Sequence, residues 1–357
     1  VIDLSSSSVM PGLIDSHTHM LLTMDPDEHG GSYFVTGLVN SGAYRAIEGV
    51  ANARSMLEHG FTTIRDLGNN ANHGDSDLRR AIEAGVVPGP TIVNSGRIIA
   101  PYGGQFQLQP ERRDLAEPEY LFADTRDELI NAVRENIHYG AKVIKIVVDD
   151  QPYLYSVEDI ELVVEEARRV GLKVAAHAVS DKGFYNAAAA GVASVEHGFE
   201  ASDASLKKAR KNDVVLVGTD MTELTAQLWE KDAIYRLAVI ERTRRARRIG
   251  VEMAFGSDVF YSWPGRTRGD LSLAHIDPYI EAGVENDYLL KMLTVNGAKL
   301  LGLEATRARI AEGYYADIVA MPGNPLEDVT ALRKIHFVMK EGRVFRHDAM
   351  RATSPSP

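Results

Sequence analysis

Short apolar runs rich in β-branched residues alternate along the chain with longer amphipathic segments. Because the strands of a parallel sheet are buried on both faces, the apolar runs predict strands and the amphipathic segments predict helices that cover them. The predicted strands cover residues 12–19, 61–66, 91–99, 142–148, 173–179, 194–199, 214–219 and 253–258. The predicted helices cover residues 43–59, 78–84, 125–140, 156–171, 186–190, 204–211 and 286–301, with a further helix that ends at 248.

The order of these elements predicts the fold class. The chain has eight predicted strands, and a helix follows each of them. This count is typical of an α/β fold of the (β/α)8 or TIM-barrel type. A doubly wound sheet would have fewer such units and usually a glycine-rich turn after its first strand, and no such turn follows residues 12–19. We therefore expect an active site where the carboxyl ends of the strands meet.

The pattern changes after residue 303. Residues 309–321 and 334–346 resemble short strands separated by turns, and a segment of about 45 residues is too small to bury a core of its own. We expect it to form a small β-appendage together with the other chain terminus. The predicted domains are a remnant of an N-terminal β region at 1–10, a barrel at 11–303, a C-terminal β region at 304–349 and a tail at 350–357. The chain opens as if within a strand, so we expect the first part of the β region to be missing from the sequence.

Composition narrows the functional classes. The 357 residues are 45% hydrophobic and 25% charged, as in an ordinary globular protein, and the net charge of −11 argues against nucleic-acid binding. No apolar stretch is long enough to span a membrane. The chain has no cysteine, which excludes disulfides, thiolate metal sites and cysteine nucleophiles. Any metal would need His, Asp, Glu or a less usual ligand.

Two histidines end the first predicted strand. Residues i and i+2 of a strand point to the same side, so His17 and His19 project together at the carboxyl end of the barrel. Taken alone, this pair is also compatible with two ordinary histidines. His177, His197 and Asp258 follow the fifth, sixth and eighth strands in the same way. Polar side chains buried there without partners would cost several kcal/mol, and a divalent metal would offset that cost.

Lys145 lies inside the apolar fourth strand. A charged lysine in a buried strand is costly unless it is paired, so its amine requires an explanation. One explanation is a lysine that reaches a carboxylate at the barrel rim. The other is a lysine carboxylated by CO2, whose carbamate supplies anionic oxygen ligands to two metals.

These residues together resemble the binuclear class of the amidohydrolase superfamily. The order is H-x-H on strand one, Lys on strand four, His on strands five and six, and Asp on strand eight; residues 9–19 and 313–319 also match. Residues 59–68 (HGFTTIRDLG) resemble the imidazolonepropionase-related branch, which contains Xaa-Pro dipeptidases, carboxypeptidases for basic residues and ochratoxin A-degrading amidohydrolases. The amino-acid sequence as a whole is most similar to that of the bacterial ochratoxin-degrading amidohydrolases.

The resemblance implies a ligand set and a mechanism. His17, His19 and Asp258 would hold one divalent metal and His177 and His197 a second, and we expect both metals to be zinc. Carboxylated Lys145 and a hydroxide would bridge the two metals. The hydroxide would attack an amide carbonyl, and Asp258 would pass the proton to the leaving amine. The implied partner is a small-molecule amide, and the implied assembly is a homo-oligomer.

Six further residues are candidates for binding substrate. Relatives often carry a histidine where this chain has Gln105, which can still donate a hydrogen bond to an oxyanion. Tyr155 follows the fourth strand, where relatives place a substrate-binding tyrosine, although a packing role is equally compatible. Aromatic and cationic residues follow Asp258 and could bind an aromatic acid; they are Tyr261, Trp263, Arg266 and Arg268.

These observations predict hydrolysis of the amide bond to a C-terminal amino acid, preferably a hydrophobic one. N-acyl amino acids, dipeptides and ochratoxin A, which would release phenylalanine, all fit this description. The alternatives are an Xaa-Pro dipeptidase or basic-residue carboxypeptidase of the same fold, a mononuclear deaminase, and a barrel without catalytic activity. A deaminase would lack the lysine and keep a glutamate after the fifth strand, where this chain has Ala178-Val179-Ser180.

Overall fold

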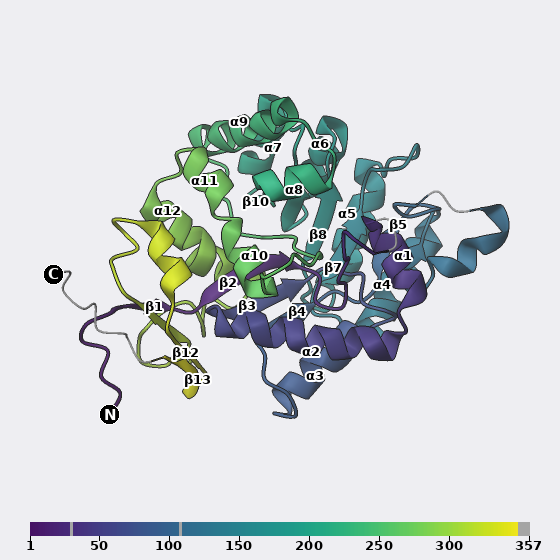
Figure 1. Ribbon diagram of the computed structural model, residues 1–357. Coiled ribbons are helices and arrows are strands. Elements are labelled where there is room, and N and C mark those ends of the chain that lie inside the picture. Colours follow the sequence, from purple (N-terminus) through teal and green to yellow (C-terminus); the bar gives the residue numbers. More distant parts are fainter. Residues whose placement is uncertain (29–30, 107–108, 349–357) are drawn as a thin grey trace.

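The computed structural model describes residues 1–28, 31–106 and 109–348, and it has the predicted barrel at its centre. Parallel strands form two sheets, in the orders β2-β3-β4 and β10-β9-β8-β7-β5-β6, and helices surround them (Figure 1). The strands are β2 (Leu13–Thr18), β3 (Phe61–Asp66), β4 (Thr91–Asn94), β5 (Ile98–Ala100), β6 (Tyr120–Phe122), β7 (Ile144–Val147), β8 (Val174–Ala178), β9 (Ser194–His197) and β10 (Val215–Val217). This confirms the predicted fold class.

Backbone hydrogen bonds join the two sheets into a closed barrel. The Asn94 carbonyl oxygen at the end of β4 accepts from the backbone N–H of Lys142, just before β7. On the other side, Leu216 of β10 forms a β-bridge with Met253, and the backbone N–H of Ser16 in β2 donates to the carbonyl of Phe255. Closure brings the carboxyl ends of strands far apart in sequence to one rim.

Two predicted strands are less regular than the sequence indicated. The third is broken into β4 and β5 at Gly96, whose φ of +72° belongs to the left-handed region, and a Cβ there would lie 2.4 Å from the Asn136 side chain. The segment 253–258, predicted as the eighth strand, does not form a regular strand. It is held by an isolated β-bridge and by backbone hydrogen bonds, and Asp258 has a φ of +55°.

The helices follow the predicted order, with additions between the strands. The longer ones are α2 (Gly42–Glu58), α3 (Gly74–Glu83), α4 (Arg126–His138), α5 (Val157–Arg168), α6 (Asp181–Ala190), α7 (Asp203–Lys211) and α9 (Ala233–Ile249). The closing segment consists of α12 (Asn286–Lys291), a π-helical turn (Met292–Asn296) and α13 (Gly297–Leu301). Short helices that the pattern did not predict are α1 (Tyr33–Val39), α8 (Glu223–Leu228), α10 (Arg268–Ala274) and α11 (Asp277–Glu281), with 3-10 turns at Pro110–Leu115 and Val329–Lys334.

Both termini contribute to one antiparallel sheet beside the barrel, in the order β1-β11-β12-β13. Its strands are β1 (Ser8–Pro11), β11 (Ile318–Met321), β12 (Phe337–Lys340) and β13 (Arg343–His347). Figure 1 shows this sheet at the side of the barrel, with the N-terminal segment next to the last strands. The predicted appendage formed by the chain termini is therefore confirmed. The predicted tail at 350–357 lies outside the described residues.

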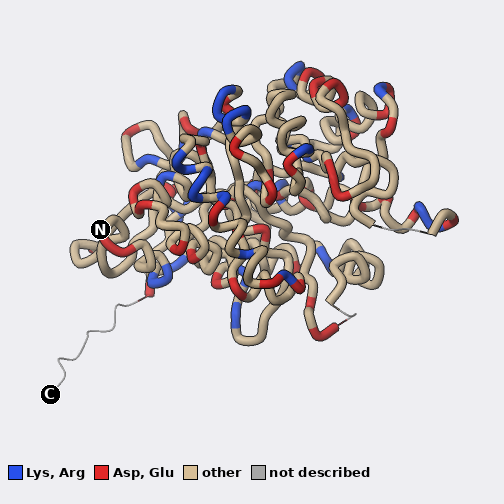
Figure 2. The backbone as a smooth tube through the Cα atoms, turned by 90° about the horizontal axis from the view of Figure 1, so that it is seen from above, with Lys and Arg blue, Asp and Glu red and all other residues tan. Residues whose placement is uncertain are grey.

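Charged residues of both signs are mixed over the molecule (Figure 2). The arginine-rich end of α9 is an example, because Arg242, Arg245 and Arg247 each pair with a carboxylate at 2.7–3.0 Å. Within the described residues, no helix combines the length and the apolar character needed to cross a membrane.

Candidate metal centre and active site

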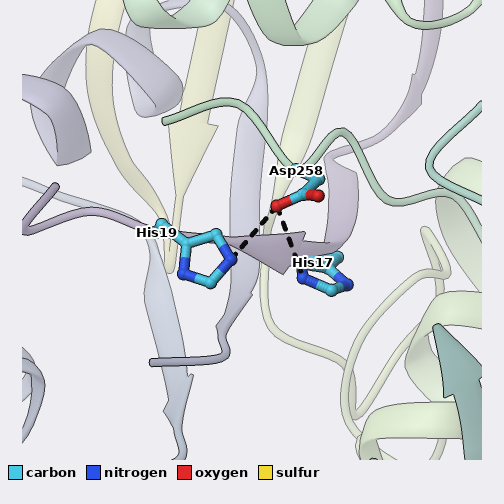
Figure 3. Close-up of side chains that lie close together, drawn as sticks. All are labelled: His17, His19 and Asp258. Atoms are coloured by element: carbon cyan, nitrogen blue, oxygen red, sulfur yellow. Dashed lines mark ion pairs between the residues drawn. The ribbon is translucent and has the colours of Figure 1, made fainter. Parts of the chain in front are cut away.

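One cavity of about 540 Å³ opens at the carboxyl ends of the barrel strands. All six residues predicted as metal ligands line it: His17, His19, Lys145, His177, His197 and Asp258. They come from β2, β7, β8, β9 and the segment after Phe255, so barrel closure is what brings them together. Figure 3 shows His17, His19 and Asp258 converging from separate segments of the chain.

Asp258 lies among the imidazoles. Its Oδ1 is 3.1 Å from His19 Nε2 and 3.5 Å from His17 Nε2, and its Oδ2 is 3.8 Å from His197 Nδ1 (Figure 3 draws the first two contacts). Asp258 and His197 both have left-handed backbone, with φ of +55° and +68°. Such conformations cost about 1–3 kcal/mol in a residue other than glycine and are common at functional sites. The backbone N–H of Asp258 donates to the His17 carbonyl at 2.8 Å, which holds this turn in place.

Each imidazole has one ring nitrogen engaged by the protein. The contacts are His17 Nδ1 with Glu196 at 2.8 Å, His19 Nδ1 with the Gly68 carbonyl at 2.8 Å, His197 Nδ1 with Thr219 Oγ1 at 2.8 Å, and His177 Nε2 with Asp150 at 2.6 Å. The second nitrogens of His17 and His19 lie beside Asp258 Oδ1, close enough for one cation to contact all three residues. Each ring thus has an outer contact within the protein. Metal-binding histidines almost always show this arrangement, because the outer contact fixes the tautomer and the ring orientation. The donor set therefore fits a centre for divalent cations.

Burial favours the neutral form of two imidazoles of the site, those of His17 and His197. Burial lowers the pKa of His17 to about 4 and moves the pKa of His197 well below its usual value. A metal binds the neutral ring, so this environment favours binding. Burial alone would raise the pKa of Glu196, but Arg65 at 2.8 Å and His17 outweigh that effect and lower it to about 2. Glu196 is thus a buried carboxylate that orients His17.

Lys145 is 2% exposed on β7 and lines the cavity floor beside these groups. Among the described residues, the Lys145 amine has no hydrogen-bond partner and no ion-pair partner within 4 Å. Burial lowers its pKa to about 8, although the carboxylates of Glu196 and Asp258 act in the opposite direction. A lysine of this kind reaches its neutral form more easily than a surface lysine.

Two acidic residues that sequence reasoning missed, Asp149 and Asp150, follow β7. Asp149 accepts hydrogen bonds from the Val179 and Ser180 backbone and from the Ser180 hydroxyl, so it anchors the loop after β8. Asp150 has a φ of +74° and turns its carboxylate into the cavity, where it contacts His177. Burial would raise the pKa of Asp150, but His177 and Gln105 outweigh it and lower the pKa to about 2. Their position after an apolar strand, the signal used for His177, could have identified them.

Of the six predicted substrate-binding residues, the structure brings Gln105 to the cavity. Its amide nitrogen donates to Asp150 at 3.0 Å, and its amide oxygen accepts from the Tyr120 hydroxyl at 2.8 Å. Gln105 therefore has both ends of its amide engaged within the protein.

The structure does not place the other five candidates on the cavity wall. Tyr155 is buried, and its hydroxyl donates to the Ala123 carbonyl at 2.6 Å. Tyr261 is buried with its hydroxyl 3.2 Å from Thr225 Oγ1, and Trp263 packs beside it. Arg268 is buried and donates to the backbone carbonyls of Val259 and Leu22. Arg266 lies on the exposed turn that forms a bridge with Trp263. These contacts make Tyr155, Tyr261 and Arg268 parts of the scaffold.

The cavity wall is formed by aromatic residues that the sequence did not single out. Tyr33 from α1 and Trp229 after α8 both approach Phe260, with ring centroids 5.6 and 5.9 Å apart. Tyr235 and Lys231 complete this side. Phe260 lies in the aromatic stretch directly after Asp258 and lines the same cavity, so that stretch was the sequence signal for it. Trp229, Lys231 and Tyr235 lie between the seventh and eighth strands, where the sequence shows no comparable pattern.

With this geometry in place, comparison with known proteins identifies the family. The sequence pattern of the amidohydrolase family matches residues 8–345 of this chain. The chain belongs to the amidohydrolase family. This amidohydrolase is 28% identical over 377 aligned positions to ochratoxinase from Aspergillus niger, an alignment that covers 95% of this chain and 75% of the relative. It is 24% identical to imidazolonepropionase from Kosmotoga olearia, with 98% and 86% covered.

Solved structures of similar proteins agree with this assignment. A Xaa-Pro dipeptidase with methionine bound in its active site superposes with a TM-score of 0.85 at 27% identity, covering 97% of this chain and 88% of that one. The A. niger ochratoxinase structure gives 0.82 at 25% identity, with 96% and 84% covered. The predicted superfamily and branch are therefore confirmed, and this amidohydrolase is a hydrolytic enzyme that acts on amides.

The first prediction concerns the carboxylate that orients His17. Glu196→Gln should weaken divalent-metal binding by about 10–100-fold, because loss of an outer contact of a metal-binding histidine has effects of this size. The measurement is competition for zinc with a chelator, read by elemental analysis. Glu166→Gln is the matched control, since Glu166 is also buried against arginines, Arg134 and Arg169, but lies on α5 away from the cavity. Equal affinities for the two variants would contradict the role of Glu196.

Proposed function

We propose that this enzyme is a metal-dependent amide hydrolase that cleaves the bond to a hydrophobic C-terminal amino acid. N-acyl amino acids, dipeptides and ochratoxin-like amides are the candidate substrates. The observation that carries the proposal is a single cavity with imidazoles, a carboxylate and a buried lysine at its floor and an aromatic wall above them. Similarity to proteins named ochratoxinase and Xaa-Pro dipeptidase supports this substrate class.

The floor of the cavity fits two divalent cations, for which we propose zinc. His17, His19 and Asp258 would hold one and His177 and His197 the other, with Lys145 between them as a CO2-derived carbamate. Bound divalent cations supply Lewis acidity at the carbonyl oxygen and a water nucleophile at neutral pH. Histidine and carboxylate ligands suit zinc and could also suit manganese, cobalt or iron.

Asp258 is the group proposed to move the proton. Burial would raise its pKa, but His17, His19 and Lys145 lower it to about 2, so its carboxylate is ionised at neutral pH. Either Oδ atom can then accept the proton of the attacking water and deliver it to the nitrogen of the leaving amine. The backbone turn at Asp258 fixes the carboxylate between the imidazoles, which limits the reorientation needed between these two transfers.

The aromatic wall favours an apolar substrate. Tyr33 and Trp229 each contact Phe260, and these three rings line the cavity above the proposed metal-binding floor. A phenyl side chain that buries about 150 Å² of surface there would contribute roughly 4 kcal/mol before ordering costs. A basic side chain would need a free carboxylate. The acidic residues among the described lining, Asp150 and Asp258, are both already paired with imidazoles.

The buried lysine generates a prediction about CO2. Lys145→Ala should lower activity at least about 100-fold, because removal of an outer contact alone costs up to about that factor. Acetate or propionate should restore part of it by supplying a carboxylate. In the wild type, labelled bicarbonate should give a carbamate resonance by ¹³C NMR. Lys142→Ala, an exposed lysine three residues earlier, is the control. Full activity and two bound metals in Lys145→Ala would exclude the carbamate.

Asp258→Asn separates proton transfer from metal binding. The amide keeps an oxygen ligand but is a much weaker base, so turnover should fall by about 10²–10⁴-fold, the range typical of general acid–base catalysis. Metal content measured on the same samples should remain largely intact. Near-normal turnover with full metal content would show that another residue moves the proton.

The substrate class is tested by one panel of amides under one set of conditions. We expect kcat/KM to be higher for an N-aroyl-phenylalanine than for an Xaa-Arg dipeptide, because the wall offers apolar area and no free carboxylate. An Xaa-Pro dipeptide belongs in the panel because of the similarity to a Xaa-Pro dipeptidase. If Xaa-Arg were the best substrate by tenfold or more, the proposed substrate class would be wrong even though the metal chemistry stood.

A further inference from the structure

Lys231 occupies a distinctive position at the rim of the cavity. It follows α8 and precedes α9, and its side chain is exposed while also lining the cavity. Among the described residues of the lining, the lysines are Lys145 at the floor and Lys231, and no arginine is present. Lys231 is thus the cation left to meet an incoming substrate once Lys145 serves the metal centre.

Local structure fixes the backbone of Lys231 and leaves its amine available. Its backbone N–H donates to the Ala226 carbonyl at 2.8 Å, which ends α8 in a defined turn. The neighbouring Asp232 caps α9 through the backbone N–H of Tyr235 at 2.7 Å, so that carboxylate serves the helix. The Lys231 amine lies 5.0 Å from the centre of the Tyr235 ring, and the described structure gives it no hydrogen bond or ion pair.

The surroundings of Lys231 match a ligand with an apolar body and an anionic end. Trp229 and Tyr235 line the cavity on either side of it in sequence, and Trp229 packs toward Phe260. Burial, together with the negative charges of Glu200 and Asp150, raises the pKa of Tyr235. Its hydroxyl therefore remains protonated and can donate a hydrogen bond to an anion. The wall thus combines a cation, a neutral donor and apolar surface.

We propose that Lys231 and Tyr235 form the subsite for the free carboxylate of the substrate, so that the enzyme selects N-acyl amino acids over the corresponding carboxamides. This inference rests on the proposed function, because it assigns the carboxylate of the same substrate class. It takes the place of the substrate contacts predicted for Tyr155, Arg266 and Arg268, whose side chains do not line the cavity. A charge-assisted hydrogen bond to a carboxylate is stronger than a neutral one, which gives the subsite its selectivity.

The test compares N-benzoyl-phenylalanine with N-benzoyl-phenylalaninamide, which differ only in the C-terminal group, an anionic carboxylate in the first and a neutral carboxamide in the second. Release of phenylalanine or of phenylalaninamide reports cleavage of the same amide bond in each. Lys231→Gln should lower kcat/KM for the acid about 10–100-fold, mainly through KM, and change the value for the carboxamide less than about twofold. Lys231→Glu should lower the acid value further, because it places like charge against the carboxylate.

Lys182→Gln is the matched control. Lys182 also lies over a tyrosine ring, that of Tyr185 at 5.9 Å, but it is exposed on α6 and does not line the cavity. Its loss should leave both substrates unaffected. Equal losses on the acid and the carboxamide in Lys231→Gln would indicate a merely structural role and overturn the assignment, as would an unchanged value for the acid.

Binding measurements distinguish failure of this inference from failure of the proposed function. If the metal-loaded wild type cleaved neither compound, the proposed function would fail. Calorimetric binding of N-benzoyl-phenylalanine would still test the subsite. Affinity at least tenfold weaker in Lys231→Gln than in the wild type and in Lys182→Gln would support it. Equal affinity in the three proteins, or no binding to any, would overturn it.

Discussion

The buried ion pair between Arg65 and Glu196 is the interaction on which the centre of this molecule depends. Arg65 on β3 donates to the Glu196 carboxylate of β9 at 2.8 Å and also to the Ser16 carbonyl of β2. Glu196 in turn holds His17. Two charges removed from water are costly unless they are hydrogen-bonded, and here each guanidinium nitrogen of Arg65 and both carboxylate oxygens of Glu196 have a partner. The pair joins three strands across the barrel interior and fixes the ring orientation of His17, the first of the candidate metal-binding histidines.

Unusual backbone conformations direct the side chains at the ends of the strands. Asp150, His197 and Asp258 all have left-handed backbone although none is glycine, and each follows or ends a strand. A regular strand would alternate these side chains between the interior and the helical layer. The local turns instead direct all three toward one cavity. The strain is tolerated because neighbouring contacts hold each turn, such as the bond from the Asp258 backbone to His17.

How far the sequence predicted this site depends on how each residue is positioned. His17, His177 and Asp258 were identifiable because a polar residue after an apolar strand is a local signal, and the barrel brings all strand ends together. Tyr155 was misleading, since whether a loop side chain faces the cavity depends on contacts distant in sequence, here the Ala123 carbonyl. The position of Lys231 at the cavity rim could not be predicted for the same reason. It depends on how the segment between α8 and α9 packs on Phe260 and Tyr235.

The floor and the wall of the cavity differ in how the fold holds their residues in place. Most of the cavity floor is built on strands whose backbones are hydrogen-bonded on both sides, and contacts from the surrounding protein fix the orientation of each candidate metal-binding imidazole. The wall is built on α1, Phe260 and the α8–α9 segment, which the strands do not constrain. Substitutions in the wall can therefore alter the preferred substrate without disturbing the floor. That independence agrees with the finding that proteins named ochratoxinase, Xaa-Pro dipeptidase and imidazolonepropionase are all similar to this chain, since one barrel can carry sites for different substrates.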